Sequence, residues 1–175
     1  MVVTPWLYTA FIALIGIERL VELVVSKRNA KWSFANGGKE IGLGHFPFMV
    51  VLHTGFLFGM VAEVWLLGRL FTPVIGYSML TLALLTQGLR WWCILTLGKR
   101  WNTRVIIVPG LPRVTGGPYR FLSHPNYVAV ILEGIALPLI HGAWLSALLF
   151  SALDGVLLWW RISVEEAALD EMELT

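Results

Sequence analysis

Long apolar runs recur along the chain and constrain its fold more than any other feature. A helix rises about 1.5 Å per residue, so about 20 residues cross a hydrocarbon core of about 30 Å. The runs occupy residues 6–25, 46–67, 74–97, 127–140 and 144–160. They predict an all-α integral membrane protein with about five transmembrane helices. Only three residues separate the last two runs, so these should form a tight helical hairpin.

Composition and length support one membrane domain over residues 1–175. Apolar residues make up 57% of the chain and charged residues 14%, against roughly 25% charged residues in soluble domains. The fourth run is too short to span alone, so we expect its helix to begin within 117–123 and to break at Pro125. The single cysteine, Cys93, predicts neither a disulfide nor a cysteine metal site.

Basic residues predict the orientation, because short cytoplasmic loops collect Lys and Arg. They follow the first and third runs: Lys27, Arg28, Lys31, Lys39, Lys99, Arg100, Arg104, Arg113 and Arg120. Both loops should therefore be cytoplasmic, with the N-terminus outside and the C-terminus inside. Basic residues placed beside apolar runs, at a net charge of only +2, indicate membrane orientation and no nucleic-acid partner.

The connection between the third and fourth runs is the most suggestive segment. Residues 105–110 (VIIVPG) are typical of a short extended stretch, and residues 114–127 (VTGGPYRFLSHPNY) concentrate glycine, proline and aromatic residues. Irregular backbone at membrane depth is tolerated only where it is buried in protein or lines a cavity. The segment therefore predicts a small-molecule pocket on the cytoplasmic side, with a re-entrant linker as the alternative.

Arg161 and Glu165 follow the fifth run four residues apart, on one face of a helix. An arginine offers a planar fork to a carboxylate or enolate, and a carboxylate can accept from the ribose hydroxyls or amino group of a nucleoside cofactor. The alternative is an interfacial salt bridge beside Trp159 and Trp160.

GPYRFLSHPNY at 117–127, followed by RISVEEAAL at 161–169, resembles the isoprenylcysteine carboxyl methyltransferase family. The resemblance covers about residues 99–169. It implies S-adenosylmethionine (SAM) as cofactor, S-adenosylhomocysteine as product, and a lipophilic or prenylated substrate from the bilayer. It also implies that residues 98–170 are the cofactor-binding and catalytic region.

The resemblance assigns Arg161 and Glu165 as catalytic, Arg161 near the reacting group and Glu165 on the cofactor. It implies these cofactor-binding residues: Leu111, Pro112, Arg113, Val114, Tyr119, His124, Pro125, Asn126, Tyr127 and Glu165. The family usually has an arginine where this chain has Ser123, and a histidine-containing segment at 111–113. We hypothesise that Arg113 or Arg120 supplies the missing charge.

The N-terminal half resembles a small bacterial branch of this family, through ERLVELVVSKRNAKW, GGKE and GHFPFMVVLH. That branch implies methylation of alkylpyrone or alkylresorcinol hydroxyls in the bacterial inner membrane, with residues 1–70 on the substrate side. The predicted substrate-binding residues are Arg161, Glu18, Arg19, Glu22, His45 and His53.

The predicted reaction is O-methylation of a lipophilic substrate without a metal. A carboxylate acceptor arrives ionised, whereas a phenol or enol needs a base, for which His45, His53 or an N-terminal acid is a candidate. One alternative is an NADPH-dependent membrane reductase, since some sterol reductases carry a similar HPNY segment. Another is a small transporter or scaffold, prompted by polar residues inside the runs: Glu63, Arg90, Glu133 and Asp154.

Overall fold

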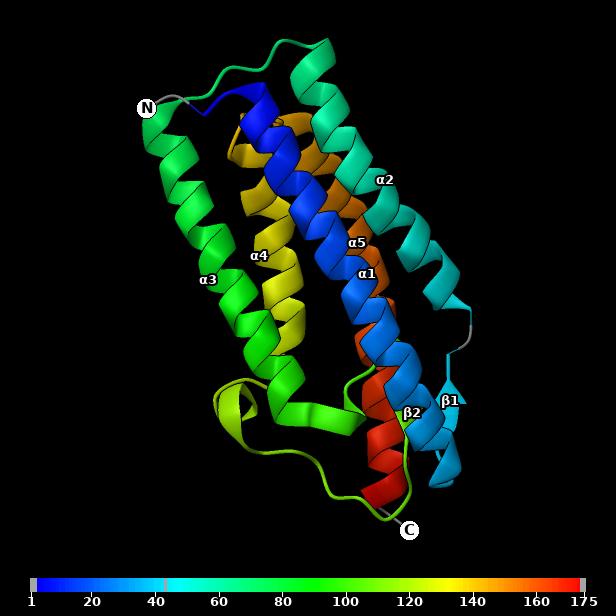
Figure 1. Cartoon of the computed structure of the whole chain (residues 1–175). Helices are drawn as coiled ribbons and strands as arrows, with labels where there is room; N and C mark the ends of the chain where they lie inside the picture. Colours follow the sequence, from blue (N-terminus) through cyan, green and yellow to red (C-terminus); the bar gives the residue numbers. More distant parts are fainter. Residues whose placement is uncertain (1–2, 43, 174–175) are drawn as a thin grey trace.

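The computed structural model describes residues 3–42 and 44–173, except the side chains of residues 45 and 169–173. Five α-helices form one bundle (Figure 1), so the predicted all-helical class is confirmed. They are α1 (Pro5–Ala35), α2 (His45–Leu66), α3 (Pro73–Leu97), α4 (Pro125–Leu139) and α5 (Trp144–Glu173).

Three segments are long and apolar enough to cross a membrane: Phe46–Leu66, Pro73–Arg100 and Trp144–Ala168. Helix α4 is a shorter apolar helix, and α1 carries Glu18, Arg19 and Glu22 within its apolar half. The tight hairpin of α4 and α5 is confirmed, because α4 ends at Leu139 and α5 begins at Trp144.

The outer surface of the bundle is apolar while charged side chains are buried, as expected for a chain in lipid. Phe58, Leu66 and Val74 are among the large apolar residues more than 70% exposed. Inside, a core cluster includes Tyr8 and Met60, each at most 1% exposed. Water would penalise such a surface, whereas hydrocarbon solvates it.

The expected early start of the fourth helix is wrong, because α4 begins at Pro125. Residues Gly117–Arg120 instead form a separate 3₁₀ turn, η2. Pro125 lacks a backbone N–H and disfavours helical geometry at the preceding residue, and His124 has φ −129° and ψ 62°.

Helices α1 and α5 are longer than the apolar runs that predicted them. Lys27, Arg28 and Lys31 lie on the continuing α1 helix and not in a loop, because no glycine or proline occurs between the end of the apolar run at residue 25 and Gly37. Gly37 follows the helix with φ +80°, the left-handed conformation that favours glycine. Similarly, α5 continues past Arg161 and Glu165, which places both side chains on a rigid helix.

A short antiparallel sheet joins the two loops at one end of the bundle. Strand β1 (Lys39–Ile41) pairs with β2 (Val105–Ile107), with Lys39 opposite Ile107. The extended stretch at 105–107 is confirmed, whereas β1 was not predicted. Figure 1 shows the sheet at the end where α5 finishes, and we call this the sheet end of the bundle. The pairing fixes the loop after α3 against the chain that links α1 to α2.

Candidate active site

A cavity at the sheet end is lined by the loop after α3 and by α5. We call it the loop cavity. Most of its lining comes from residues 100–124 of the loop, while α4 contributes Asn126 and Tyr127, and α5 contributes Arg161, Glu165 and Glu166. Arg100 holds one part of this wall, because its Nη1 donates to the Pro112 carbonyl over 2.6 Å. The irregular segment predicted to line a pocket thus does so.

Ionisable side chains of both signs face this cavity. His124 Nε2 lies 2.6 Å from Glu166 Oε1, and Arg113 Nη1 lies 3.7 Å from Glu166 Oε2. Tyr119 also lines the cavity, and burial raises the pKa of its phenol well above the ordinary value, so the hydroxyl stays protonated.

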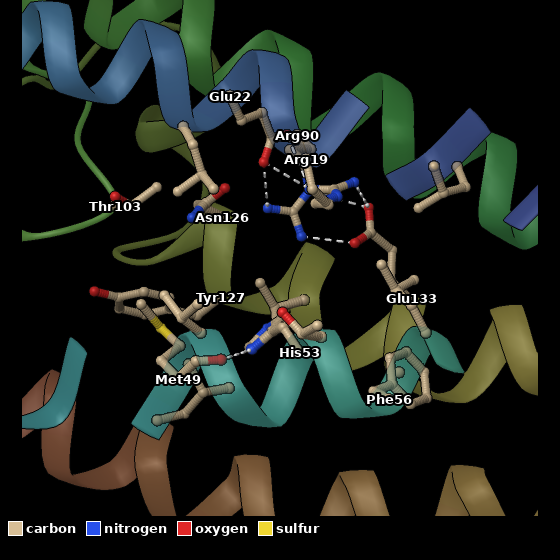
Figure 2. Close-up of a pocket in the computed structure, with 18 of the residues that line it drawn as sticks. Arg19, Glu22, Met49, His53, Phe56, Arg90, Thr103, Asn126, Tyr127 and Glu133 are labelled. Carbon is tan, nitrogen blue, oxygen red and sulfur yellow. Dashed lines mark hydrogen bonds and ion pairs between the residues drawn. The ribbon is translucent and has the colours of Figure 1, made fainter. Parts of the chain in front are cut away.

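A second cavity lies deeper, between the helices, and we call it the bundle cavity. Its walls are mostly apolar side chains such as Ile15, Leu57 and Phe150. Figure 2 shows that four ionic side chains lie along one wall, and that His53 projects from α2 on the opposite side. Those four are Arg19, Glu22, Arg90 and Glu133.

The four ionic side chains are paired with one another. Arg90 donates to Glu133 through Nε (3.1 Å) and Nη2 (2.6 Å). Arg19 Nη1 lies 2.8 Å from both Glu22 oxygens, and its Nη2 donates to Gln87 over 2.7 Å. Since burial leaves such charges stable only when paired, this network fixes α1, α3 and α4 relative to one another.

Arg161 is held where the two cavities meet. Its Nε donates to the Tyr127 hydroxyl over 2.9 Å and its Nη1 to the Thr103 carbonyl over 2.7 Å. The Tyr127 hydroxyl in turn donates to Glu165. Five residues line both cavities, and we call them the junction: Trp101, Asn102, Asn126, Tyr127 and Arg161. A group bound in one cavity can therefore reach a group bound in the other only past Arg161 and its neighbours.

The structure brings most predicted site residues to one cavity or the other. The loop cavity is lined by Leu111, Pro112, Arg113, Val114, Tyr119, His124, Asn126, Tyr127 and Glu165, and the bundle cavity by Arg19, Glu22, His53 and Arg161. Pro125 and Glu18 are not in these linings: Pro125 opens α4, and Glu18 accepts from Gln87 and Trp91. His45 opens α2, and its side chain lies outside the described residues.

Trp101 and Asn102 were missed, although they line the junction. They lie between the apolar third run, which ends at residue 97, and the motif at 117–127 that carries the resemblance, so neither periodicity nor motif singles them out. Their neighbours in space are distant in sequence, since Asn29 Nδ2 donates to the Trp101 carbonyl (2.8 Å) and Ser26 Oγ donates to Asn102 Oδ1 (3.0 Å). The available signal was an aromatic residue followed by an amide residue at the start of the loop that was predicted to line a pocket.

Comparisons with known proteins identify the family of this chain. The model of the isoprenylcysteine carboxyl methyltransferase (ICMT) family matches residues 79–171. The chain is also 34% identical over 166 residues to the uncharacterized protein YpbQ of Bacillus subtilis (strain 168), covering 94% of this chain and 98% of that one. No solved structure matches. The family match contains α4, most of α3 and α5, and the whole loop cavity segment, and the chain belongs to the isoprenylcysteine carboxyl methyltransferase family.

Proposed function

We propose that this protein is a SAM-dependent O-methyltransferase that modifies a lipophilic substrate. The observation that carries the proposal is the pair of cavities that meet at Arg161, one lined by polar loop residues and one by apolar helix faces. Transfer between two ligands requires their reacting atoms to meet in a fixed geometry. The junction residues line both cavities, so the junction is where the two reacting atoms could be held in such a geometry.

The donor set of the loop cavity fits SAM. The amino acid end of SAM carries an ammonium and a carboxylate, and Arg100, Arg113, Glu165 and Glu166 supply partners of both signs. Glu165 and Glu166 also offer acceptors for ribose hydroxyls.

The bundle cavity fits the substrate. Its apolar walls, from Ile15 of α1 to Phe150 of α5, suit an alkyl or prenyl chain. Within the family assignment the acceptor is a carboxylate of a prenylcysteine-like molecule or a hydroxyl of a long-chain polyketide such as an alkylpyrone or alkylresorcinol. Arg19, Glu22 and His53 line the same cavity and complete the proposed substrate side.

The reaction we propose uses position and desolvation. When bound, SAM supplies an electrophilic methyl group on a sulfonium. Arg161 orients the acceptor oxygen at the junction, while Glu165, bonded to Tyr127, contacts the cofactor. Apolar walls that exclude water would favour such a methyl transfer to an oxygen anion, because it neutralises charge.

We further propose five membrane spans, with the N-terminus outside and the sheet end on the cytoplasmic side of a bacterial inner membrane. Helix α1 ends, and α3 leads into the turn Gly98–Arg100, at the sheet end (Figure 1). The last turns of α1 carry Lys27, Arg28 and Lys31, and the turn after α3 carries Lys99 and Arg100, which supports this orientation. Arg69 is the one basic residue in the link between α2 and α3. The cofactor would then enter from the cytoplasm and the substrate from the bilayer.

The decisive experiment is methyl transfer by the purified protein in lipid nanodiscs. Methyl-labelled SAM is supplied with prenylcysteines, fatty acids, alkylpyrones and alkylresorcinols, and labelled product is measured. Binding of SAM and of NADPH is measured in parallel by calorimetry. We expect SAM to bind and NADPH not to bind; binding of NADPH alone would replace the proposal by a reductase, and binding of neither would favour a non-enzymatic role.

Arg161→Ala and Glu165→Ala test the placement of the chemistry. We expect Arg161→Ala to abolish turnover with SAM binding retained, and Glu165→Ala to weaken SAM binding. Arg69→Ala is the matched control, because Arg69 pairs with Glu63 far from both cavities. Thermal unfolding in the same nanodiscs verifies that each variant is folded. Full activity in both site variants would refute the assigned site.

A further inference from the structure

Buried polar atoms without a partner gather at the junction. Within the described residues, three such atoms belong to junction residues: Trp101 Nε1, Asn102 Nδ2 and Asn126 Oδ1. Folded proteins pair nearly all buried polar groups, so unpaired atoms at a cavity wall need an explanation. A bound ligand that supplies the missing partners is the explanation that their position favours.

The unpaired end of Asn102 is set by Ser26, a buried residue of α1. Ser26 Oγ accepts from the Thr103 backbone N–H over 3.0 Å and donates to Asn102 Oδ1 over 3.0 Å. The Thr103 hydroxyl lies 2.8 Å from the same Ser26 oxygen and can donate to it. Because Ser26 occupies the carbonyl end of the amide, the end left unpaired is the N–H donor.

Trp101 and Arg161 add further donors beside Asn102. An indole nitrogen can only donate, and Trp101 is 3% exposed. Arg161 uses Nε and Nη1, whereas its Nη2 makes no hydrogen bond to the residues that the structure describes. The buried unpaired groups at the junction are therefore two donors, Trp101 Nε1 and Asn102 Nδ2, against one acceptor, Asn126 Oδ1. Arg161 Nη2 adds one further donor beside them. Such a set matches an oxygen that carries negative charge.

The junction also lacks a base. Among its five residues none carries a carboxylate or an imidazole. The Tyr127 hydroxyl already donates to Glu165, and His53 lies one helical turn beyond Met49, whose sulfur is 3.2 Å from Arg161 Nη1. The nearest titratable groups outside the junction are already engaged: Glu165 accepts from Tyr127, Glu22 accepts from Arg19, and His124 pairs with Glu166. An acceptor oxygen placed among the five junction residues therefore meets no carboxylate or imidazole on them.

We propose that Trp101 and Asn102, with Ser26 as the positioning residue for Asn102, bind the acceptor oxygen as an anion and restrict substrates to oxygen acids ionised at neutral pH. This inference rests on the proposed methyltransferase function. It selects carboxylic acids and acidic enols over simple phenols, whose pKa lies near 10. In the step, a bond forms between the acceptor oxygen and the methyl carbon as the bond between that carbon and the sulfonium sulfur breaks. The electron pair of the broken bond stays on sulfur, and no proton moves.

The first test compares acceptors that share one alkyl chain and differ in acidity: a carboxylic acid, a 4-hydroxy-2-pyrone and a resorcinol. Methyl transfer from labelled SAM is measured in nanodiscs between pH 6 and pH 8. We expect kcat/KM for the two acids to be flat, and that for the resorcinol to be at least ~100-fold lower at pH 7 and to rise about tenfold per pH unit, following its ionised fraction. A resorcinol methylated at pH 7 as efficiently as the acids overturns the inference.

Asn102→Asp tests the donor itself, since it replaces an N–H group by a carboxylate of the same shape. We expect kcat/KM for the acids to fall ~100-fold with SAM affinity unchanged. Asn36→Asp is the matched control, because Asn36 is exposed at the end of α1 and bonds only locally, to the Trp32 carbonyl. Unchanged kcat/KM in Asn102→Asp overturns the inference.

Ser26 provides an independent measurement if Asn102→Asp does not fold. Ser26→Ala should lower kcat/KM about five- to tenfold at constant SAM affinity, and Ser26→Thr, which keeps the hydroxyl, should restore it. Equal activity in both variants counts against the positioning role. If the wild-type protein methylates no acceptor, the proposed function fails as well; if it methylates and these variants are unaffected, only the inference fails.

Discussion

Arg113 and Arg120 lie on the same loop, but their surroundings differ. Arg113 lines the loop cavity and approaches Glu166, whereas Arg120 is outside that lining and stacks over the Phe121 ring, 6.0 Å from its centroid. Of the two candidates for the missing cationic partner, the structure favours Arg113. The sequence could not separate them, because both are basic residues in one polar loop.

Arg113→Ala should therefore weaken SAM binding and Arg120→Ala should not. Loss of one charge-assisted contact corresponds to roughly a tenfold rise in Kd, about 1.4 kcal/mol. Calorimetric titration of SAM into each variant in nanodiscs measures the effect. Equal affinities in the two variants would show that neither arginine replaces the family's usual charge.

Single residues were predictable where the interaction is local along the chain. Arg161 and Glu165 were placed on one helix face from their spacing, and the structure places both on α5. The role of Ser26 was not predictable, because its partners Asn102 and Thr103 lie in a loop that only the folded bundle brings to α1. Short-range periodicity carries no information about such a contact.

Among the elements, turn η2 depends on a glycine with an uncommon backbone conformation. Gly117 has φ +54°, and a Cβ there would lie 2.4 Å from Thr96 Oγ1. The neighbouring Gly116 has φ −90° and open space around the equivalent position. The pair therefore offers a matched comparison within one turn.

Gly117→Ala should destabilise the turn and displace Tyr119 and His124 from the loop cavity, whereas Gly116→Ala should be nearly neutral. Strain of this kind costs about 1–3 kcal/mol. Thermal unfolding and SAM titration of the two variants check both effects. A Gly117→Ala protein with normal stability and affinity would mean that η2 does not depend on this conformation.

Helices α3 and α4 are joined by the Arg90 and Glu133 pair. Arg90→Met alone should leave two buried carboxylates, Glu22 and Glu133, with Arg19 as their one remaining cation, and cost about 3–5 kcal/mol of stability. Arg90→Met combined with Glu133→Leu should recover part of that loss, because both charges are then removed. Unfolding of the single and double variants in nanodiscs measures the difference. A double variant no more stable than Arg90→Met would show that the pair is needed for more than mutual neutralisation.

Helix number and order followed from the apolar runs, whereas helix ends did not. The runs stop where polar residues begin, but polar residues such as Lys27 and Arg28 continue a helix without difficulty. Strand β1 contains only three residues and exists because β2 pairs with it, so no local pattern could have predicted it.

At the scale of the whole molecule, the proposed orientation can be tested by chemical labelling. Cys93 is the only cysteine and is fully buried, so Cys93→Ala provides a silent background. In that background, Leu70→Cys should react with a membrane-impermeant maleimide in intact cells, and Lys31→Cys only after lysis. Leu70 is 82% exposed in the link between α2 and α3, at the opposite end of the bundle from Lys31. Labelling of Lys31→Cys in intact cells, with Leu70→Cys labelled only after lysis, would show the opposite orientation in the membrane.

The ionic network also bears on how the chain is made. Helix α1 leaves the ribosome before α3 and α4, and its charges at positions 18, 19 and 22 gain their long-range partners only when those helices follow. Until then Arg19 and Glu22, one turn apart, can neutralise each other within α1. The internal pair makes α1 less costly to release into lipid during synthesis, and it is kept and extended into the full network when Arg90 and Glu133 arrive. Biogenesis of the first helix is thus coupled to translation of the family-matched half of the chain.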